Sequence, residues 1–242
     1  MHKLYEKNEI LFSVILIIIY VVAASVCDAV SAALGMEKAF TFIFMLIYSA
    51  VLLIWMKKHR LYEKYGICKP AVSAGVFLYY IPLIVVVSCN LWFGVTMNFP
   101  PVETALYIGS MVCVGFVEEV IFRGVLFKAM CKDNVKSAII VSSLTFGIGH
   151  MVNLINGSGA ELLPNLCQVC YAIAGGFMFV AVFYKSKSLL ACIIAHSTMN
   201  SLSVFSNEAA QGDTAQIAVA VVITLISVLY SVYIFKFAKT DK

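Results

Sequence analysis

Long apolar stretches recur along the whole chain, and they limit its fold more than any other feature. They lie at about residues 10–34, 39–56, 74–95, 103–128, 136–153, 165–184, 188–205 and 215–237. A membrane-spanning helix needs about 20 apolar residues, so each stretch has roughly the length of one span. Hydrophobic residues make up 62% of the 242 residues, and charged residues make up only 12%. The sequence therefore predicts an all-α membrane protein, a polytopic bundle of about eight transmembrane helices.

The connections between these stretches are short and leave little room for a soluble domain. We therefore expect residues 1–242 to form a single integral membrane domain. The first apolar run lacks an Ala-x-Ala-like cleavage site and is long for a signal peptide, so we interpret it as a retained span. The sequence contains no basic tract, no glycine-rich phosphate loop and no interleaving of basic and aromatic residues. A nucleic-acid partner is therefore not expected.

The charges in the connections alternate along the chain. Basic residues occupy the N-terminal segment, every second connection and the C-terminal segment: Lys3, Lys7, Lys57, Lys58, Arg60, Lys64, Lys69, Lys128, Lys132, Lys136, Lys185, Lys187, Lys236, Lys239 and Lys242. The intervening connections hold mainly acidic residues: Glu37, Glu103, Glu161, Glu208 and Asp213, with Lys38. Because basic loops stay in the cytoplasm, both termini are expected there. The expected location is a cell membrane, the plasma membrane of a bacterium, which the protein crosses several times.

One apolar run contains three ionisable residues, in the stretch Gly-Phe-Val-Glu-Glu-Val-Ile-Phe-Arg-Gly at 115–124. Ionisable side chains at membrane depth are costly, so the cluster of Glu118, Glu119 and Arg123 indicates a functional site. Glu119 and Arg123 are four residues apart and share one helix face, whereas Glu118 points about 100° away. The spacing predicts that one carboxylate is neutralised within its own helix and that the other is free for chemistry. The alternative is an ion-pair network that only holds the helix in place.

Polar residues on two later spans are expected at the same depth. His150 ends the stretch Leu-Thr-Phe-Gly-Ile-Gly-His, and His196 and Asn200 share a helix face. At about 1.5 Å per residue from the nearest basic loop, Glu118 lies about 15 Å deep and His196 about 14 Å deep. The same count places His150 at about 21 Å and Asn200 at about 20 Å. All four fall near the middle of a hydrocarbon core about 30 Å thick, so three helices deliver polar groups to one level.

This set of side chains has the parts needed for hydrolysis by activated water. A carboxylate beside a neutral imidazole can deprotonate water, the role predicted for Glu118 with His150. A second histidine and an amide can donate hydrogen bonds to an oxyanion, the role predicted for His196 and Asn200. The alternative is a zinc ion held by Glu118, His150 and His196 with an open position for water. The residues alone leave both mechanisms open.

Three ordered motifs resemble those of one known family: Glu118-Glu119-x-x-x-Arg123, Phe146-x-x-x-His150 and His196-x-x-x-Asn200. This is the CPBP family of CAAX proteases and bacteriocin-processing enzymes, also called the Abi family, which includes the Rce1-type prenyl-protein endopeptidases. The resemblance is strongest over about residues 110–205 and places the protease core at about 103–205. It implies an intramembrane protease.

The resemblance also implies a role for each motif residue: Glu118 and His150 activate water, His196 and Asn200 stabilise the oxyanion, and Glu119 and Arg123 form a supporting ion pair. It implies a glutamate-dependent endopeptidase that requires no cofactor, and zinc dependence remains the alternative. The expected substrates are peptides or prenylated, lipid-anchored proteins within the membrane lipids, cut near the cytoplasmic half of the bilayer. In a bacterium without ordinary prenylation, leader-peptide processing or self-immunity is favoured over CAAX trimming.

Two functions from other classes also fit a membrane bundle of this kind. An ion-coupled transporter would place ionisable residues at the midplane, but the sequence shows neither inverted repeats nor paired half-helices. A non-catalytic bacteriocin self-immunity protein, or another binding membrane protein, would keep the fold without needing Glu118 as a base. The intact set of motifs favours the protease.

Overall fold

The computed structural model describes residues 1–156 and 160–238, and within this range the chain is helical with irregular connections. Lys239 and Lys242 of the predicted basic C-terminus lie outside the described residues. The helical elements, in chain order, are α1 (His2–Lys7), α2 (Glu9–Ala33), α3 (Ala39–Lys58), η1 (Ala74–Tyr80), α4 (Ile81–Val87), η2 (Ser88–Leu91), α5 (Pro101–Glu118), η3 (Glu119–Phe127), α6 (Lys128–Met130), α7 (Val135–Gly149), η4 (His150–Leu154), α8 (Leu162–Ser186), α9 (Leu190–Leu202), η5 (Ser203–Phe205), η6 (Glu208–Ala210) and α10 (Asp213–Phe237).

Seven helical segments of the described chain are long and apolar enough to cross a membrane: Glu9–Ala33, Ala39–Lys58, Ala74–Leu91, Pro101–Met130, Val135–Leu154, Leu162–Ser186 and Asp213–Phe237. These lengths and compositions indicate a multi-pass membrane protein. The remaining segment of the eight expected, 188–205, forms the shorter apolar helix Leu190–Phe205. Its polar second half ends in a turn of 3-10 helix, so the apolar run does not extend to a full span. The orientation of the termini stays a prediction.

The outer faces of the long helices are apolar. On α2, Ile18, Val22 and Val26 recur every four residues and are each more than half exposed (55%, 57% and 57%). On α10, Leu225 and Leu229 repeat the same spacing with exposures of 55% and 68%. Exposed apolar stripes of this length are costly in water and are typical of surfaces that contact lipid. The apolar outer surface is therefore what membrane-spanning helices of this composition should expose to lipid.

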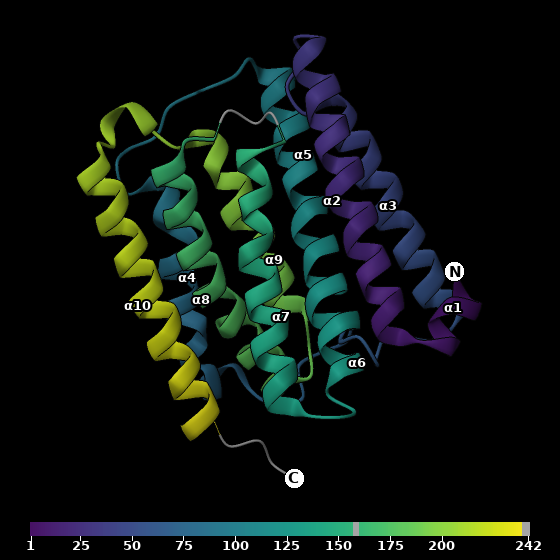
Figure 1. Cartoon of the computed structure of the whole chain (residues 1–242). Helices are drawn as coiled ribbons and strands as arrows, with labels where there is room; N and C mark the ends of the chain where they lie inside the picture. The colour runs from purple at the N-terminus through teal and green to yellow at the C-terminus, as the bar shows by residue number, and fades with distance from the viewer. Residues whose placement is uncertain (157–159, 239–242) are drawn as a thin grey trace.

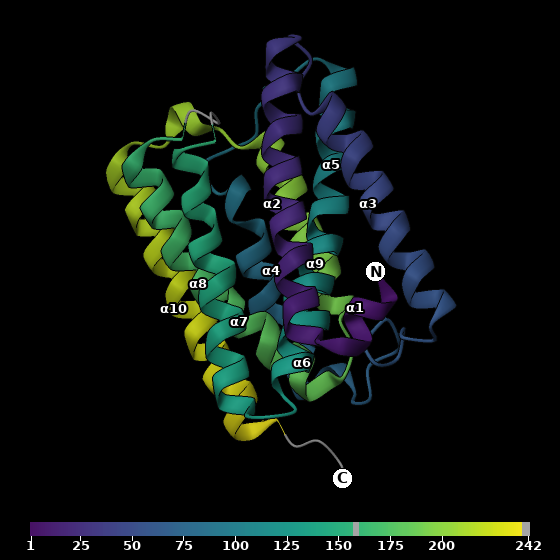
Figure 2. The same cartoon turned by 45° about the vertical axis from the view of Figure 1, so that its right-hand side comes forward.

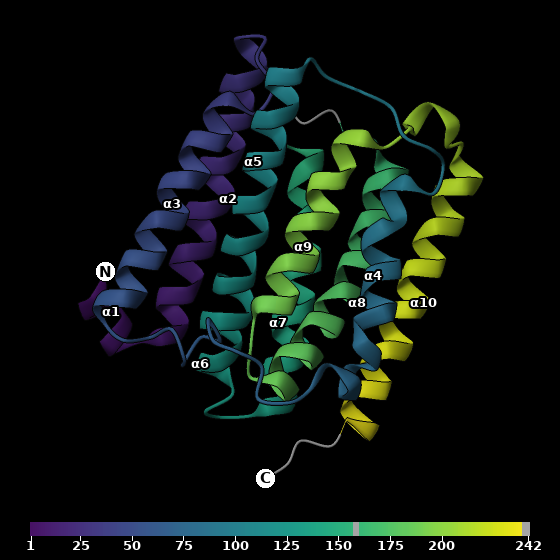
Figure 3. The ribbon, with the colours of Figure 1, turned by 180° about the vertical axis from the view of Figure 1, so that it is seen from behind.

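The helices form two groups, which meet at α9 and where η3 packs against α7. On one side α5 packs against α3, and α2 packs against both α3 and η3 (Figure 1). On the other side α8 lies between α7 and α10 (Figure 2). Seen from behind, α9 lies between α5 and α4, and it packs closely against α5 (Figure 3). One face of the short helix is buried against these neighbours and carries His196 and Ser197, whereas Ile194 on another face is 66% exposed.

The two ends of the bundle carry different charges. At one end, the start of α2 meets two basic connections: Glu9 Oε1 lies 2.7 Å from Lys64 Nζ and 3.0 Å from Lys132 Nζ. We call this the lysine-rich end, and it lies at the bottom of Figure 1 with the last turn of α10. The opposite end carries the turn between α2 and α3, where Lys38 Nζ lies 2.9 Å from Asp28 Oδ1. We call this the acidic end. The alternation seen in the sequence thus separates the charges in space.

Small residues let α7 and α8 approach closely. A Cβ atom on Gly176 of α8 would lie 2.9 Å from the Cα atom and 3.0 Å from the carbonyl oxygen of Ser143 on α7. A side chain cannot relieve this contact, because both neighbouring atoms belong to the backbone. Gly175, the preceding residue, faces open space and would meet no atom within 4 Å. The two adjacent glycines therefore differ only in what they face.

We predict that Gly176→Ala destabilises the protein by about 1–3 kcal/mol, the usual cost of overpacking a tight interface. Gly175→Ala is the matched control and should stabilise by up to about 1 kcal/mol, because alanine is the better helix former. Thermal unfolding of the purified protein in detergent measures both. Equal behaviour of the two variants would show that the close approach of α7 and α8 is not a constraint.

Candidate active site

The two motif glutamates lie where α5 continues into a π-helical segment. This segment, η3, covers Glu119–Phe127, and all nine of its residues are buried. The sequence predicts only an ordinary helix here. A π-helix bonds residue i to residue i+5, which widens the turn, and such insertions are frequent at functional sites. A helix that is buried all round lies in the core of a bundle. The cluster is thus built into the most enclosed part of the fold.

Glu119 and Arg123 form an ion pair inside η3. Arg123 Nη1 donates to Glu119 Oε1 at 3.0 Å, and both side chains are completely buried. The guanidinium carbon of Arg123 lies 4.0 Å from the ring centroid of Phe146 on α7, a cation–π contact. A buried charge without a partner costs several kcal/mol, so each residue depends on the other. The i,i+4 spacing of the motif accounts for the contact between Glu119 and Arg123.

His196 of α9 contacts both glutamates. Its Nδ1 atom lies 2.8 Å from Glu119 Oε1, and its Nε2 atom lies 3.2 Å from Glu118 Oε2. Both contacts are hydrogen bonds when both ring nitrogens carry hydrogen, and the imidazole is then positively charged. Phe179 of α8 stacks on the ring at a centroid distance of 5.5 Å, and Phe146 meets it edge-on at 5.5 Å. His196 therefore links the two carboxylates, a geometry that spacing alone does not predict.

Glu118 is held from a third direction by a tyrosine. Tyr20 of α2 donates its hydroxyl to Glu118 Oε1 at 2.6 Å, while Glu118 Oε2 faces His196. Sequence reasoning missed Tyr20, because it sits in an uninterrupted apolar run with no polar neighbour at helical spacing. A tyrosine in such a run reads as an ordinary membrane residue. Only the packing of α2 against η3 brings it to the motif.

His150 and Asn200 lie on the wall of the same cavity as Glu118 and His196. The Nδ1 atom of His150 lies 3.2 Å from the carbonyl oxygen of Phe146. A carbonyl only accepts, so this contact places the hydrogen on Nδ1 and leaves Nε2 of the neutral ring as an acceptor. Asn165 of α8 donates to the backbone carbonyl of His150 at 2.9 Å, a second contact absent from the sequence prediction.

The cavity has a volume of about 390 Å³. All four predicted catalytic side chains line it, whereas the Glu119–Arg123 pair lies behind its wall. Space of this size accommodates a segment of peptide. Within the described residues, no three side chains of His, Cys, Asp or Glu are arranged to hold a metal ion. Glu118, His150 and His196 thus share a cavity without forming the compact ligand set of a zinc site.

A glycine makes this arrangement sterically feasible. A Cβ atom on Gly115 of α5 would lie 2.5 Å from Ser197 Oγ and 2.6 Å from the Ser197 backbone nitrogen on α9. Ser197 Oγ also donates to the carbonyl of Val112 at 3.0 Å, which locks the two helices together. Because Ser197 directly follows His196, the close approach at Gly115 sets the distance from His196 to the glutamates of the next turn.

We predict that Arg123→Leu lowers stability by about 3–5 kcal/mol, because it leaves a buried carboxylate uncompensated. The double variant Glu119→Gln/Arg123→Leu should recover part of that loss, since it removes both charges. Lys132→Ala, which breaks an ion pair whose lysine is 60% exposed, is the control and should cost less than about 1 kcal/mol. Thermal unfolding in detergent compares the three. A double variant as unstable as Arg123→Leu would argue against charge balance as the stabilising factor.

Of the comparisons with known proteins, one gives a match, and it covers the motif residues of this site. No curated protein and no solved structure matches the chain. Residues 100–202 match the family model described as type II CAAX prenyl endopeptidase Rce1-like. That range contains η3, α7 and α9 and therefore all three motifs of the site. Over residues 100–202 the chain is therefore similar to the Rce1-like type II CAAX prenyl endopeptidase family, the family that its motifs predict.

Proposed function

We propose that the chain is an intramembrane endopeptidase that hydrolyses peptide bonds of membrane-associated substrates with water activated by Glu118. The observation that carries the proposal is that two adjacent carboxylates have different partners and different access to the cavity. Glu119 is paired with Arg123 and fully buried, whereas Glu118 lines the cavity and is held by Tyr20 and His196. A carboxylate that is oriented and reachable from a cavity is suited to act as a general base.

Glu118 and His150 would activate the water between them. Glu118 accepts a proton from the water, and the water oxygen attacks the carbonyl carbon of the scissile bond. The unprotonated Nε2 of His150 accepts the hydrogen bond from the other hydrogen of the water and so fixes its orientation. When the C–N bond breaks, Glu118 returns the proton to the leaving amine. The two products are a carboxylic acid and an amine, and no covalent enzyme intermediate forms.

His196 and Asn200 would stabilise the oxyanion that develops on the carbonyl oxygen. The amide of Asn200 faces the cavity and can donate directly. His196 Nε2 contacts Glu118 in the resting protein. Once Glu118 has taken up a proton it loses its charge and binds that N–H less strongly. The N–H is then released to the oxyanion at the step in which the negative charge appears.

Zinc dependence is the alternative mechanism, with Glu118, His150 and His196 as ligands. The arrangement of these side chains gives it no specific support, because they do not form a compact ligand set in the described chain. The two mechanisms differ in one measurable property. Metal-dependent hydrolysis stops in a strong chelator and returns with zinc, whereas glutamate-dependent hydrolysis is unaffected. Proteolysis by the purified protein is therefore measured with and without chelator.

We predict that Glu118→Gln lowers the rate of peptide cleavage at least about 10²-fold, because the amide cannot accept the proton of water. Glutamine keeps the size of the side chain and can still accept the hydrogen bond of Tyr20. The measurement uses purified protein in liposomes and a library of prenylated and leader-type peptides. Glu63→Gln, an exposed carboxylate in the connection after α3, is the matched control and should leave the rate unchanged.

Each outcome of that measurement has a definite meaning. Cleavage that survives chelator and disappears in Glu118→Gln supports the glutamate mechanism. Cleavage that is equal in wild type and Glu118→Gln rejects the assignment of the base. Cleavage that is lost in chelator and recovered on addition of zinc supports the metal mechanism. Binding of peptides without any cleavage favours the non-catalytic immunity function.

We also predict that Tyr20→Phe lowers kcat about 10-fold or more with little change in KM. A hydrogen bond to a charged group contributes about 1.5–3 kcal/mol. The bond from Tyr20 orients the carboxylate of Glu118 and does not itself contact the substrate, so its loss should affect kcat more than KM. Steady-state kinetics with the best peptide of the library separate the two constants. Tyr48→Phe is the control. The hydroxyl of Tyr48 donates to a carbonyl oxygen of α2 at a distance of 2.9 Å, and Tyr48 does not line the cavity. A fall confined to KM would mean that Tyr20 binds substrate rather than positioning the base.

A further inference from the structure

Within the described residues, the cavity reaches only one end of the bundle. Its polar lining continues from Glu118 to the last turns of α2 with Ser25 and Asp28 and to the start of α3 with Lys38. Tyr107 near the start of α5 and Gln168 near the start of α8 line the same space. These residues belong to the helix ends that meet at the acidic end (Figure 1). The cavity therefore runs from the glutamates toward the acidic end.

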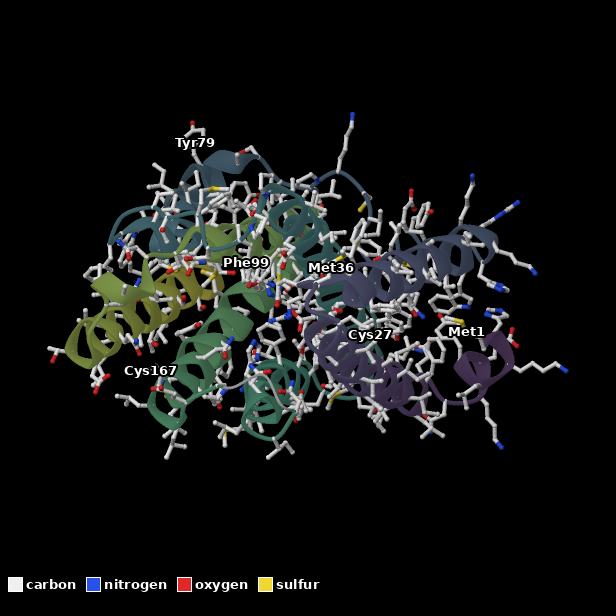
Figure 4. All side chains as sticks on the ribbon, turned by 90° about the horizontal axis from the view of Figure 1, so that it is seen from above. Met1, Cys27, Met36, Tyr79, Phe99 and Cys167 are labelled. Carbon is white, nitrogen blue, oxygen red and sulfur yellow. The ribbon has the colours of Figure 1, made fainter. Side chains whose placement is uncertain are left out.

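The charged pair at this mouth is itself part of the cavity wall. Lys38 Nζ lies 2.9 Å from Asp28 Oδ1 and 5.8 Å from the ring centroid of Tyr107. Thr41 also donates to Asp28. A cavity closed to water would leave such groups poorly solvated, whereas a mouth that meets water can keep them. Figure 4 looks down on this end and labels Cys27 and Met36, which flank the last turn of α2, and Cys167 beside Gln168.

The other end of the bundle is closed beneath the site. Every residue of η3 is buried, and Phe127 at its end has only 1% of its surface exposed. Tyr65 and Leu189, which come from the connections of the lysine-rich end, are fully buried and pack around Gly124 of η3. The lining of the cavity includes no residue from the described connections at the lysine-rich end. In the described part of the chain, the cavity therefore does not extend from Glu118 to the lysine-rich end.

From these two observations we infer that substrates reach the site from the extracytoplasmic side of the membrane, and that the scissile bond lies in an extracytoplasmic or outer-leaflet peptide segment. The lysine-rich end is the cytoplasmic one by the positive-inside rule, so the open acidic end faces outward. The inference deepens the proposed function and rests on it for the substrate. It differs from the expectation that cleavage occurs near the cytoplasmic half of the bilayer, and the experiments below distinguish the two.

The side on which the cavity opens can be tested without any proteolysis. All eight cysteines are replaced in the full-length chain, and single cysteines are then introduced at the mouth by Ser25→Cys or Gln168→Cys. Asp133→Cys, in the exposed turn before α7 at the lysine-rich end, is the matched control. A charged, membrane-impermeant thiosulfonate is applied to intact spheroplasts and to inverted membrane vesicles. Labelling after unfolding in detergent confirms that every thiol is present and reduced.

The expected result is labelling of both mouth cysteines in spheroplasts and not in inverted vesicles, with the reverse for Asp133→Cys. Labelling of the mouth cysteines only in inverted vesicles would overturn the inference. Labelling from neither side, with full reaction after unfolding, would also overturn it, since the cavity would then be closed. These readouts do not depend on catalysis, so they hold even when the proposed hydrolysis fails.

A second measurement tests the substrate itself. The peptide that the purified protein cleaves is added outside spheroplasts and outside inverted vesicles, each with wild type and Glu118→Gln. Cleavage by wild-type spheroplasts alone supports extracytoplasmic entry, and cleavage by wild-type inverted vesicles alone rejects it. Reaction of Ser25→Cys with the thiosulfonate should in addition block cleavage in spheroplasts, because the adduct fills the mouth. Unchanged cleavage after complete labelling would show that the peptide enters elsewhere.

Discussion

The structure is organised around a set of charges that must balance inside a bundle made for lipid. Glu118 and Glu119 are adjacent, and two ionised carboxylates without partners would be very costly at this depth. Arg123 compensates one of them from within the same helix, and His196 contacts both from α9. The positions of η3 and α9 are therefore coupled, because neither helix can move without leaving a charge exposed to an apolar surrounding.

Close packing at small residues is what makes that coupling geometrically feasible. Contacts of 2.6–3.2 Å between side chains of α2, α5, η3 and α9 require backbones that approach more closely than most side chains allow. Gly115 supplies this approach between α5 and α9, and Gly176 supplies it between α8 and α7. Phe146 of α7 then contacts Arg123 and both histidines of the site. The ring of Phe146 thus fixes the position of α7 relative to the charged cluster. The packing of several helices therefore determines the geometry of one site.

Local periodicity and membrane thickness explain which parts of this arrangement the sequence predicts. The Glu119–Arg123 contact depends only on a spacing of four residues within one helix. The shared cavity of Glu118, His150, His196 and Asn200 follows from equal depths, which can be counted from the basic loops. What could not be predicted depends on how helices pack. The bridging of two carboxylates by His196 and the contact of Tyr20 both arise between segments far apart in the chain. The π-helical geometry of η3 and the shortness of α9 also have no clear signature in hydropathy.

The segment that matches the family and the segment that surrounds it contribute different things to the site. Residues 100–202 contain all of the motif residues. Tyr20, Asp28 and Lys38 come from α2 and from the turn that leads into α3, outside that range. Tyr20 holds the proposed base, Glu118, and Asp28 and Lys38 line the cavity that leads to it. Because helices outside the family match line part of the proposed access route, the family indicates the type of reaction but not the side of the membrane from which the substrate comes.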